Sequence, residues 1–308
     1  MLLNKSFHAI CLAFGNLGPL LTSMRLSQRI IQAIPPGHSP LLQIPHFTPA
    51  LVSHIEKQGE RNHWSVQRLM SLPEDQRKKL CTGKGRLTPA QYTNAMIFGH
   101  SFPVVHVEAA FFKVTGEKFI TPSSLVQFVV KMRIIPPGST PPPVDPKDLN
   151  DEDPDETDVE ALLGRKDKFG AAEDEAKPGE GSKDLPLAHA PFYPRDYHPC
   201  LNIFLADSRQ GKLVVPPQAI RSFDRSPDNF AVVTAKMQFQ APPNPGEYSF
   251  QMMVVSDSYI GLDLQRPVQL VVSDPSKVER IEEIDDISEP DEGMFFPDGV
   301  GRRSMLTW

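Results

Sequence analysis

The sequence predicts an α+β protein in which short helices precede an antiparallel β-sandwich that is split by a charged insert. Residues 1–102 contain amphipathic segments with helix start and stop signals. Residues 103–137 and 187–274 instead contain runs of β-branched and aromatic residues separated by turn signals. No catalytic constellation accompanies these runs, so the pattern is typical of a scaffold.

Composition supports this interpretation. A chain of 308 residues has room for roughly two domains. The formal net charge of −6 argues against a nucleic-acid-binding domain, which presents a basic face. The 32 prolines are about twice the usual share and indicate many loops. Cys11, Cys81 and Cys200 have no ligand-like spacing, so we expect buried thiols in a reducing compartment.

Residues 1–44 are predicted to form the end of a helical bundle. The first helix places Leu3, Phe7, Ile10, Phe14 and Leu17 on one face, which leaves an apolar stripe that needs a partner. Polar residues interrupt this segment and no A-x-A site closes it, which argues against a secretory signal. No run approaches the ~18 apolar residues of a membrane span, so we expect the chain to be soluble as written.

The second predicted helix covers residues 22–34, with Ile30 in the core and Gln28 facing water. Residues 45–102 then form a cluster of short helices in a helix-loop-helix arrangement. Thr48 is a plausible N-cap. Two capping-box spacings follow, with N-cap candidates at Ser71 and Thr88.

Strands are expected from residue 104 onward. Two lie at residues 104–114 and 124–135, and five more lie between residues 200 and 274 with turn signals every ~8–15 residues. Residues 138–186 separate the two groups, and their dense charge predicts disorder. A loop of ~50 residues indicates either a domain boundary or a tolerated insertion, and the return of strands favours insertion.

The last segment, residues 275–308, is predicted to be an acidic and disordered tail. Both acidic segments are more typical of solvated disorder than of binding sites, but either could dock on a basic partner by long-ranged attraction. Ser288 and Thr157 have an acidic residue three positions later, as acidophilic kinases prefer, which makes them candidate phosphorylation sites.

The sequence predicts no catalytic, metal-binding or cofactor-binding site. The nine histidines show no H-E-x-x-H spacing, and no serine lies in a G-x-S-x-G turn, so we expect no enzyme activity, no metal and no cofactor. Residues 82–86, TGKGR, lack Walker spacing. With Arg77, Lys78 and Lys79 just before it, this loop could still form a small basic patch for an acidic partner or an RNA backbone.

The order of these pieces resembles one family. The blocks SPLLQIPHFTPALV, SVQRLMSLPEDQRKKL, FPVVHVEAAFFKVTGEKFITPSSLVQFVVKMRIIPP and HAPFYPRDYHPCLNIFLADSRQGKLVVPP closely resemble the cytosolic C-terminal region of Sec sixty-three proteins, the J-domain subunits of the endoplasmic-reticulum translocation complex. The resemblance covers about residues 2–274, and the long insert resembles fungal members. Large spliceosomal DExH RNA helicases carry the same modules, but the acidic segments and the lack of helicase motifs favour the translocation family.

This resemblance implies a fibronectin type III-like sandwich and a non-catalytic scaffold on the cytosolic face of the endoplasmic-reticulum membrane. It implies docking on a cytosolic loop of the channel, to favour an open gate, and binding of the acidic tail to the basic segment of a Sec sixty-two type accessory subunit. We expect the channel contact on exposed sandwich turns: Gly116, Glu117, Lys118, Ser256, Asp257 and Ser258. The tail candidates are Glu282, Glu283, Asp285, Asp286, Glu289, Asp291 and Glu292.

Two features depart from the family pattern. The chain has neither membrane spans nor the His-Pro-Asp tripeptide of a J-domain, so we expect a fragment, a truncated gene product or an isolated domain. It could also be a soluble regulatory fragment that competes with the full-length subunit. The alternative from another class is an accessory module of an RNA helicase, with Lys84 and Arg86 at the nucleic acid.

Overall fold

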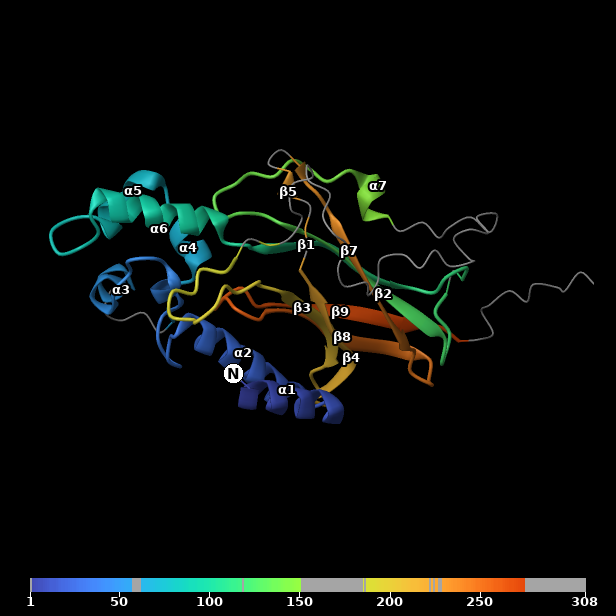
Figure 1. Ribbon diagram of the computed structural model, residues 1–308. Helices are drawn as coiled ribbons and strands as arrows, with labels where there is room; N and C mark the ends of the chain where they lie inside the picture. Colours follow the sequence, from blue (N-terminus) through green and yellow to red (C-terminus); the bar gives the residue numbers. More distant parts are fainter. Residues whose placement is uncertain are drawn as a thin grey trace, which may run out of the picture.

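The computed structural model confirms an α+β fold, with helices at one end and along one face of an antiparallel sandwich (Figure 1). The structure describes residues 2–56, 62–117, 119–150, 185, 187–221, 223, 225–226 and 229–274. The domain boundaries expected from the sequence stay predictions.

Two antiparallel helices cover the outer face of one sheet. α1 (Leu2–Phe14) and α2 (Leu17–Gln32) are joined at Gly15, whose φ of 62° is readily available to glycine. The α1–α2 turn is hydrogen-bonded to the β3–β4 turn, since Leu17 N–H donates to the Gly211 oxygen at 2.9 Å. The helix pair therefore runs along the sandwich (Figure 1).

A small core fixes this helix pair to the sheet. It consists of buried side chains from both helices and from two strands: Cys11, Leu17, Leu20, Met24, Phe204, Ala206, Met253 and Val255. The opposite face of α1 carries four of the five residues of the predicted apolar stripe, Leu3, Phe7, Ile10 and Phe14, and all four are exposed. The fifth, Leu17, was wrongly placed, because α1 ends at Phe14 and Leu17 begins α2 inside the small core. No described residue covers that stripe.

The second helix differs from its prediction. It begins at Leu17, five residues earlier than expected, and its register places different residues inside. Gln28, expected to face water, is buried, whereas Ile30, expected in the core, is exposed. The expectation was wrong because it assumed that polar residues face solvent. In the structure, α2 instead packs a polar residue against a polar turn of the sandwich.

The short-helix cluster follows. It comprises η1 (Pro40–Gln43), α3 (Pro49–Glu56), α4 (Val66–Met70), α5 (Glu74–Cys81) and α6 (Pro89–Ser101). The capping box at Thr88 is present, with hydrogen bonds in both directions to Gln91. The one predicted at Ser71 is wrong, because Ser71 ends α4 and Pro73 precedes α5 without a side-chain cap.

The sandwich has a three-stranded and a four-stranded sheet. The first has the order β1-β2-β7, with β1 (Val105–Lys113), β2 (Leu125–Ile134) and β7 (Val233–Gln240). The second has the order β4-β3-β8-β9, with β3 (Leu201–Asp207), β4 (Lys212–Ile220), β8 (Gly246–Ser256) and β9 (Leu264–Val272).

Side chains from both sheets form the main core, which includes Phe128, Met132, Ile203, Met252 and Leu270. β3 and β8 are buried on both faces, because α1 and α2 lie on the far side of their sheet. This explains their nearly continuous apolar sequence, which does not alternate like that of a half-exposed strand.

The charged insert begins at the end of the sandwich that lies next to the short helices. β2 ends there at Ile134 and β3 begins there at Leu201, and these strands belong to different sheets. The structure describes the first part of the insert, including α7 (Pro146–Leu149). A short ladder of β5 (Arg225–Ser226) and β6 (Asn229–Phe230) completes the described elements.

Candidate partner-binding surfaces

The segment that follows β8 forms the junction between the sandwich and the helices. We define the junction as residues 256–263. Gln28 Nε2 donates to the Ser256 oxygen at 2.7 Å and to Asp263 Oδ1 at 2.8 Å. One turn later on α2, Gln32 Nε2 donates to the Ser258 oxygen at 2.9 Å. Positions i and i+4 share a helix face, so both amides reach the same segment.

The short helices hold the same segment from another side. Gln43 of η1 donates to the Ile260 oxygen at 2.9 Å and accepts from the Ile260 N–H at 3.2 Å. Gln67 of α4 donates to the Gly261 oxygen at 3.1 Å. Four glutamines from three helices thus bind main-chain groups of one segment and couple the helices to the sandwich. The bonds of Gln28, Gln32 and Gln43 satisfy buried polar groups, whereas the bond of Gln67 is exposed.

Asp257 organises the underside of this junction. Its carboxylate accepts from the Cys200 N–H at 3.0 Å and from the Tyr197 hydroxyl at 2.9 Å. Burial, and then the neighbouring Asp257 charge, raise the pKa of the Cys200 thiol to about 12 and also raise the pKa of Tyr197. The Cys200 thiol therefore stays protonated and serves as a hydrogen-bond donor.

This arrangement corrects one expectation. We expected Ser256, Asp257 and Ser258 to be an exposed turn, but the exposed fraction is 1% for Ser256 and 0% for Ser258. A Ser-Asp-Ser pattern predicts a turn but carries no information about what covers it. Here Ser256 Oγ accepts the N–H groups of residues 258 and 259, and the helices cover the turn.

The opposite end of the sandwich is exposed. We call it the distal end, formed by the β1–β2 turn, the β3–β4 turn and the β7–β8 loop (Figure 1). Gly116 has a φ of 75° in the β1–β2 turn, and Glu117 forms a bridge with Val114. Both candidates are exposed as expected, whereas Lys118 lies outside the described residues.

Apolar groups surround these turn residues. Phe119 and Leu125 are 47% and 59% exposed, and the Ser123 N–H donates to the Pro242 oxygen of the β7–β8 loop at 3.4 Å. A hollow of about 470 Å³ lies beside this loop, with Phe239, Pro242, Pro243, Tyr248 and Phe250 among its lining residues. Exposed apolar groups with a charged rim are typical of protein docking sites.

In the basic loop at residues 82–86, one of the two cations makes structural hydrogen bonds. Arg86 Nη1 donates to the Lys79 and Leu80 oxygens at 2.8 and 3.0 Å, so it closes the C-terminal end of α5. Lys78, Lys79 and Lys84 are exposed. Among the described residues, no cluster of His, Cys, Asp or Glu could hold a metal ion.

The remaining candidates cannot be placed. The tail residues from Glu282 to Glu292 and the candidate phosphorylation sites Thr157 and Ser288 lie outside the described residues. The helices that the structure describes include none that is long and apolar enough to cross a membrane.

Comparison with known proteins finds no matching family model. The chain is 27% identical over 299 residues to the translocation protein sec63 of Schizosaccharomyces pombe. The aligned region covers 92% of this chain and 44% of that protein. It is 23% and 21% identical over 269 residues to the DExH-box ATP-dependent RNA helicases DExH12 and DExH13 of Arabidopsis thaliana, covering 87% of this chain and 10% of each helicase.

The chain therefore spans less than half the length of each of these relatives. Over nearly its whole length it is similar to the fungal translocation protein sec63, so the resemblance to the C-terminal region of the Sec sixty-three family that the sequence predicts is confirmed.

Proposed function

We propose that the chain is a non-catalytic scaffold of protein translocation at the endoplasmic reticulum, where it docks on the cytosolic face of the channel. The observation that carries this proposal is the similarity to sec63 along 92% of the chain. The glutamine-bonded junction supports it, because a scaffold has to hold its binding surfaces in a fixed geometry.

The mechanism is differential binding. A docked module favours the open gate only by as much as it binds the open state more tightly than the closed state. If the helices and the sandwich moved independently, a displacement caused by a partner bound to the sandwich would not reach a partner bound to the helices. The junction joins the two parts by hydrogen bonds on two sides, so a displacement of the sandwich is passed to the helices.

The distal end is the surface that we assign to the channel. Glu117 supplies an exposed charge at its tip, and Phe119 and Leu125 supply apolar area next to it. Ser256 and Ser258 are withdrawn from this assignment because they are buried. Gly116 is retained because its positive φ shapes the turn that presents Glu117.

We assign the acidic tail to the accessory subunit of Sec sixty-two type. Seven of the residues from Glu282 to Glu292 are acidic, so a basic segment is the complementary partner. Such attraction weakens as salt rises, because exposed charges are screened. Membrane association would then come from these partners or from other parts of the protein.

Co-purification from detergent-solubilised endoplasmic-reticulum membranes tests the proposal. With this chain as bait, we expect recovery of channel and accessory subunits, with the accessory subunit lost first as salt rises. Glu117→Lys should reduce channel recovery several-fold, whereas the matched charge reversal Asp75→Lys on α5 should leave it unchanged. Equal recovery with both variants would reject the distal end as the docking surface.

The second candidate function is an accessory module of an RNA helicase, supported by the weaker similarity to DExH12 and DExH13. In that case the exposed Lys84 and its neighbour Arg86 would contact the RNA backbone. Submicromolar RNA binding with a steep salt dependence would favour this function. Absence of binding at low salt would remove it.

A further inference from the structure

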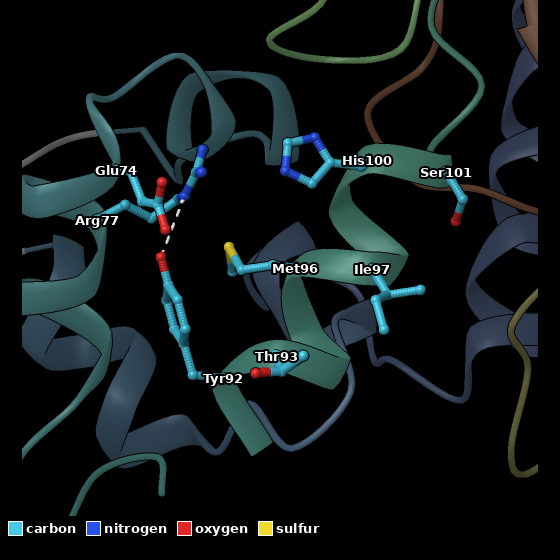
Figure 2. A pocket seen from close by; sticks show the side chains of 8 residues that line it. All are labelled: Glu74, Arg77, Tyr92, Thr93, Met96, Ile97, His100 and Ser101. Atoms are coloured by element: carbon cyan, nitrogen blue, oxygen red, sulfur yellow. Dashed lines mark hydrogen bonds between the residues drawn. The ribbon is translucent and has the colours of Figure 1, made fainter. Parts of the chain in front are cut away.

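A groove in the short-helix cluster lies far from the distal end and has no role in the function proposed above. It has a volume of about 580 Å³ and lies between α5 and α6. Figure 2 shows its walls, with Arg77 and Tyr92 joined by a hydrogen bond on one side, His100 on the other, and Met96 projecting between them. Glu74, Thr93, Ile97 and Ser101 complete the lining.

Arg77 gives the groove its polar character. Only 7% of this residue is exposed, which is unusual for an arginine without a carboxylate. Its Nη1 donates to the Met70 oxygen at 2.9 Å, and its Nε donates to the Tyr92 hydroxyl at 3.4 Å. A guanidinium has five N–H groups, so three remain. None of the three has an acceptor among the described residues, and Arg77 forms no ion pair with any of them.

The other wall, formed by α6, is accessible and partly apolar. Ile97 is 63% exposed although it is a large aliphatic residue, and Thr93 and His100 are exposed on the same side of α6. Residues at i, i+4 and i+7 share one helix face, so these three side chains form a stripe along the groove. Met96 of the same helix is buried and projects into the groove (Figure 2).

We propose that this groove binds a protein segment in which a carboxylate stands next to a bulky apolar side chain. The carboxylate would accept from the unused N–H groups of Arg77, as a charge-assisted hydrogen bond, and the apolar side chain would cover Ile97 and Met96. Charge complementarity selects this occupant, because the groove offers a buried cation that forms no ion pair with the described residues and an exposed aliphatic side chain, Ile97, beside it.

Glu74 restricts the choice of segment. Its exposed carboxylate lines the same groove and repels a second negative charge. A segment with a single carboxylate therefore fits better than a long acidic run. The groove lies on the helices and the channel surface lies at the opposite end of the sandwich, so one partner complex could engage both and gain affinity from linkage.

Selection from a phage-displayed library of random 12-residue peptides, with the full chain immobilised, tests this proposal. We expect enrichment of peptides that pair Asp or Glu with a neighbouring Leu, Ile, Met or Phe. Titration of the most enriched peptide, followed by fluorescence anisotropy, then measures its affinity. Neutralising its carboxylate, or replacing its apolar residue by serine, should each weaken binding about tenfold.

Variants of the chain locate the site. Ile97→Asp should weaken binding at least about tenfold, and Glu74→Gln should strengthen it, because a repulsive charge is lost. Leu125→Asp, an equally exposed change at the distal end, should have no effect. Exposed positions were chosen because Arg77 is also structural and its replacement could unfold the cluster.

Two results would overturn the proposal: enrichment of no acidic-apolar pattern, or peptides that bind the Ile97→Asp variant as tightly as the unchanged chain. Because this assay uses peptides and the channel assay uses membranes, either proposal can fail while the other stands.

Discussion

Gln28 and Ser256 lie 228 positions apart in the sequence, yet the Gln28 side chain donates to the Ser256 oxygen at 2.7 Å. This hydrogen bond joins α2 to the end of β8, and both residues are buried. The same amide group also donates to Asp263, whose pKa is raised because the carboxyl group is buried. A single side chain thus supports one buried and one partly buried acceptor.

We therefore expect Gln28→Leu to destabilise the protein. Leucine has a similar size but no donor, so the Ser256 oxygen and the Asp263 carboxylate lose a partner at a cost of about 1–3 kcal/mol. Urea unfolding followed by circular dichroism measures this free energy. The control is Gln76→Leu at an exposed position of α5, and equal losses in both variants would contradict a special role for Gln28.

Gln43→Glu should destabilise the protein in a pH-dependent way. Gln43 is buried and exchanges two hydrogen bonds with Ile260, and a carboxylate in its place has no donor for the Ile260 oxygen. Burial and the facing Ile260 oxygen raise the pKa of the new carboxyl group, although the Ile260 N–H still donates to it, so the penalty is present above that pKa and declines as pH falls through it.

The measurement for this variant is its difference in unfolding free energy from the unchanged chain at pH 7.5 and at pH 5. We expect about 1–3 kcal/mol at the higher pH and less at the lower pH, because a protonated glutamic acid donates again. A difference that does not change with pH would show that loss of packing explains the effect.

His63 and Glu56 form a second pH-dependent contact, at 2.9 Å between His63 Nδ1 and Glu56 Oε2. The hydrogen bond to Glu56, then that to the Gly37 oxygen, raise the pKa of His63 above 6.5. Burial raises the pKa of Glu56, but its hydrogen bonds from Ser39, His63 and the Trp64 N–H outweigh burial and lower that pKa below 4.5.

The sign of the linkage follows. Stabilisation by His63 is fully present below the unfolded value of 6.5 and is lost as pH rises through the higher folded value. Stabilisation by Glu56 is present above 4.5 and is lost as pH falls through the lower folded value. Both stabilising effects are therefore present between pH 4.5 and pH 6.5. The loss of thermal stability caused by His63→Gln should be largest in that range, and a loss that grows at alkaline pH would contradict this.

Two buried thiols should be unreactive in the folded protein. Burial raises the pKa of Cys81 to about 11, against the opposing charges of Arg77 and Arg86, and burial with the Asp257 charge raises that of Cys200 to about 12. Because the thiolate is the reactive form, a thiol reagent at pH 8 should label either only as fast as the protein unfolds. Mass spectrometry after timed labelling measures this, and rapid native labelling of Cys200 would contradict it.

The sequence predicted the fold class because helix caps and strand periodicity are local signals. Thr88 with Gln91 identified the start of α6, and the run of β-branched and aromatic residues around Phe128 identified a sandwich strand. The junction could not be predicted, because its hydrogen bonds join residues more than 190 positions apart. The local signal for the junction was the spacing of Gln28 and Gln32. This spacing indicates that both lie on one face of a helix, but it does not show which segment that face contacts.

The groove was missed for a related reason. Arg77 stands in a run with Lys78 and Lys79, and a run of cations usually faces solvent. Its position four residues before Cys81, a thiol that we expected to be buried, places it on the buried face of α5, but the run of cations was given more weight than this spacing.

Most of the bonds that hold the junction to the helices are made by neutral amides on main-chain groups, and an ion pair between Arg25 and Asp263 adds to them. This has a consequence for handling the protein. Dissolved ions screen contacts between exposed charges, but they leave buried dipole contacts nearly unchanged. A rising salt gradient should therefore detach charge-bound partners one after another while the body that held them keeps its shape. The same preparation, returned to low salt, would be ready to rebind them.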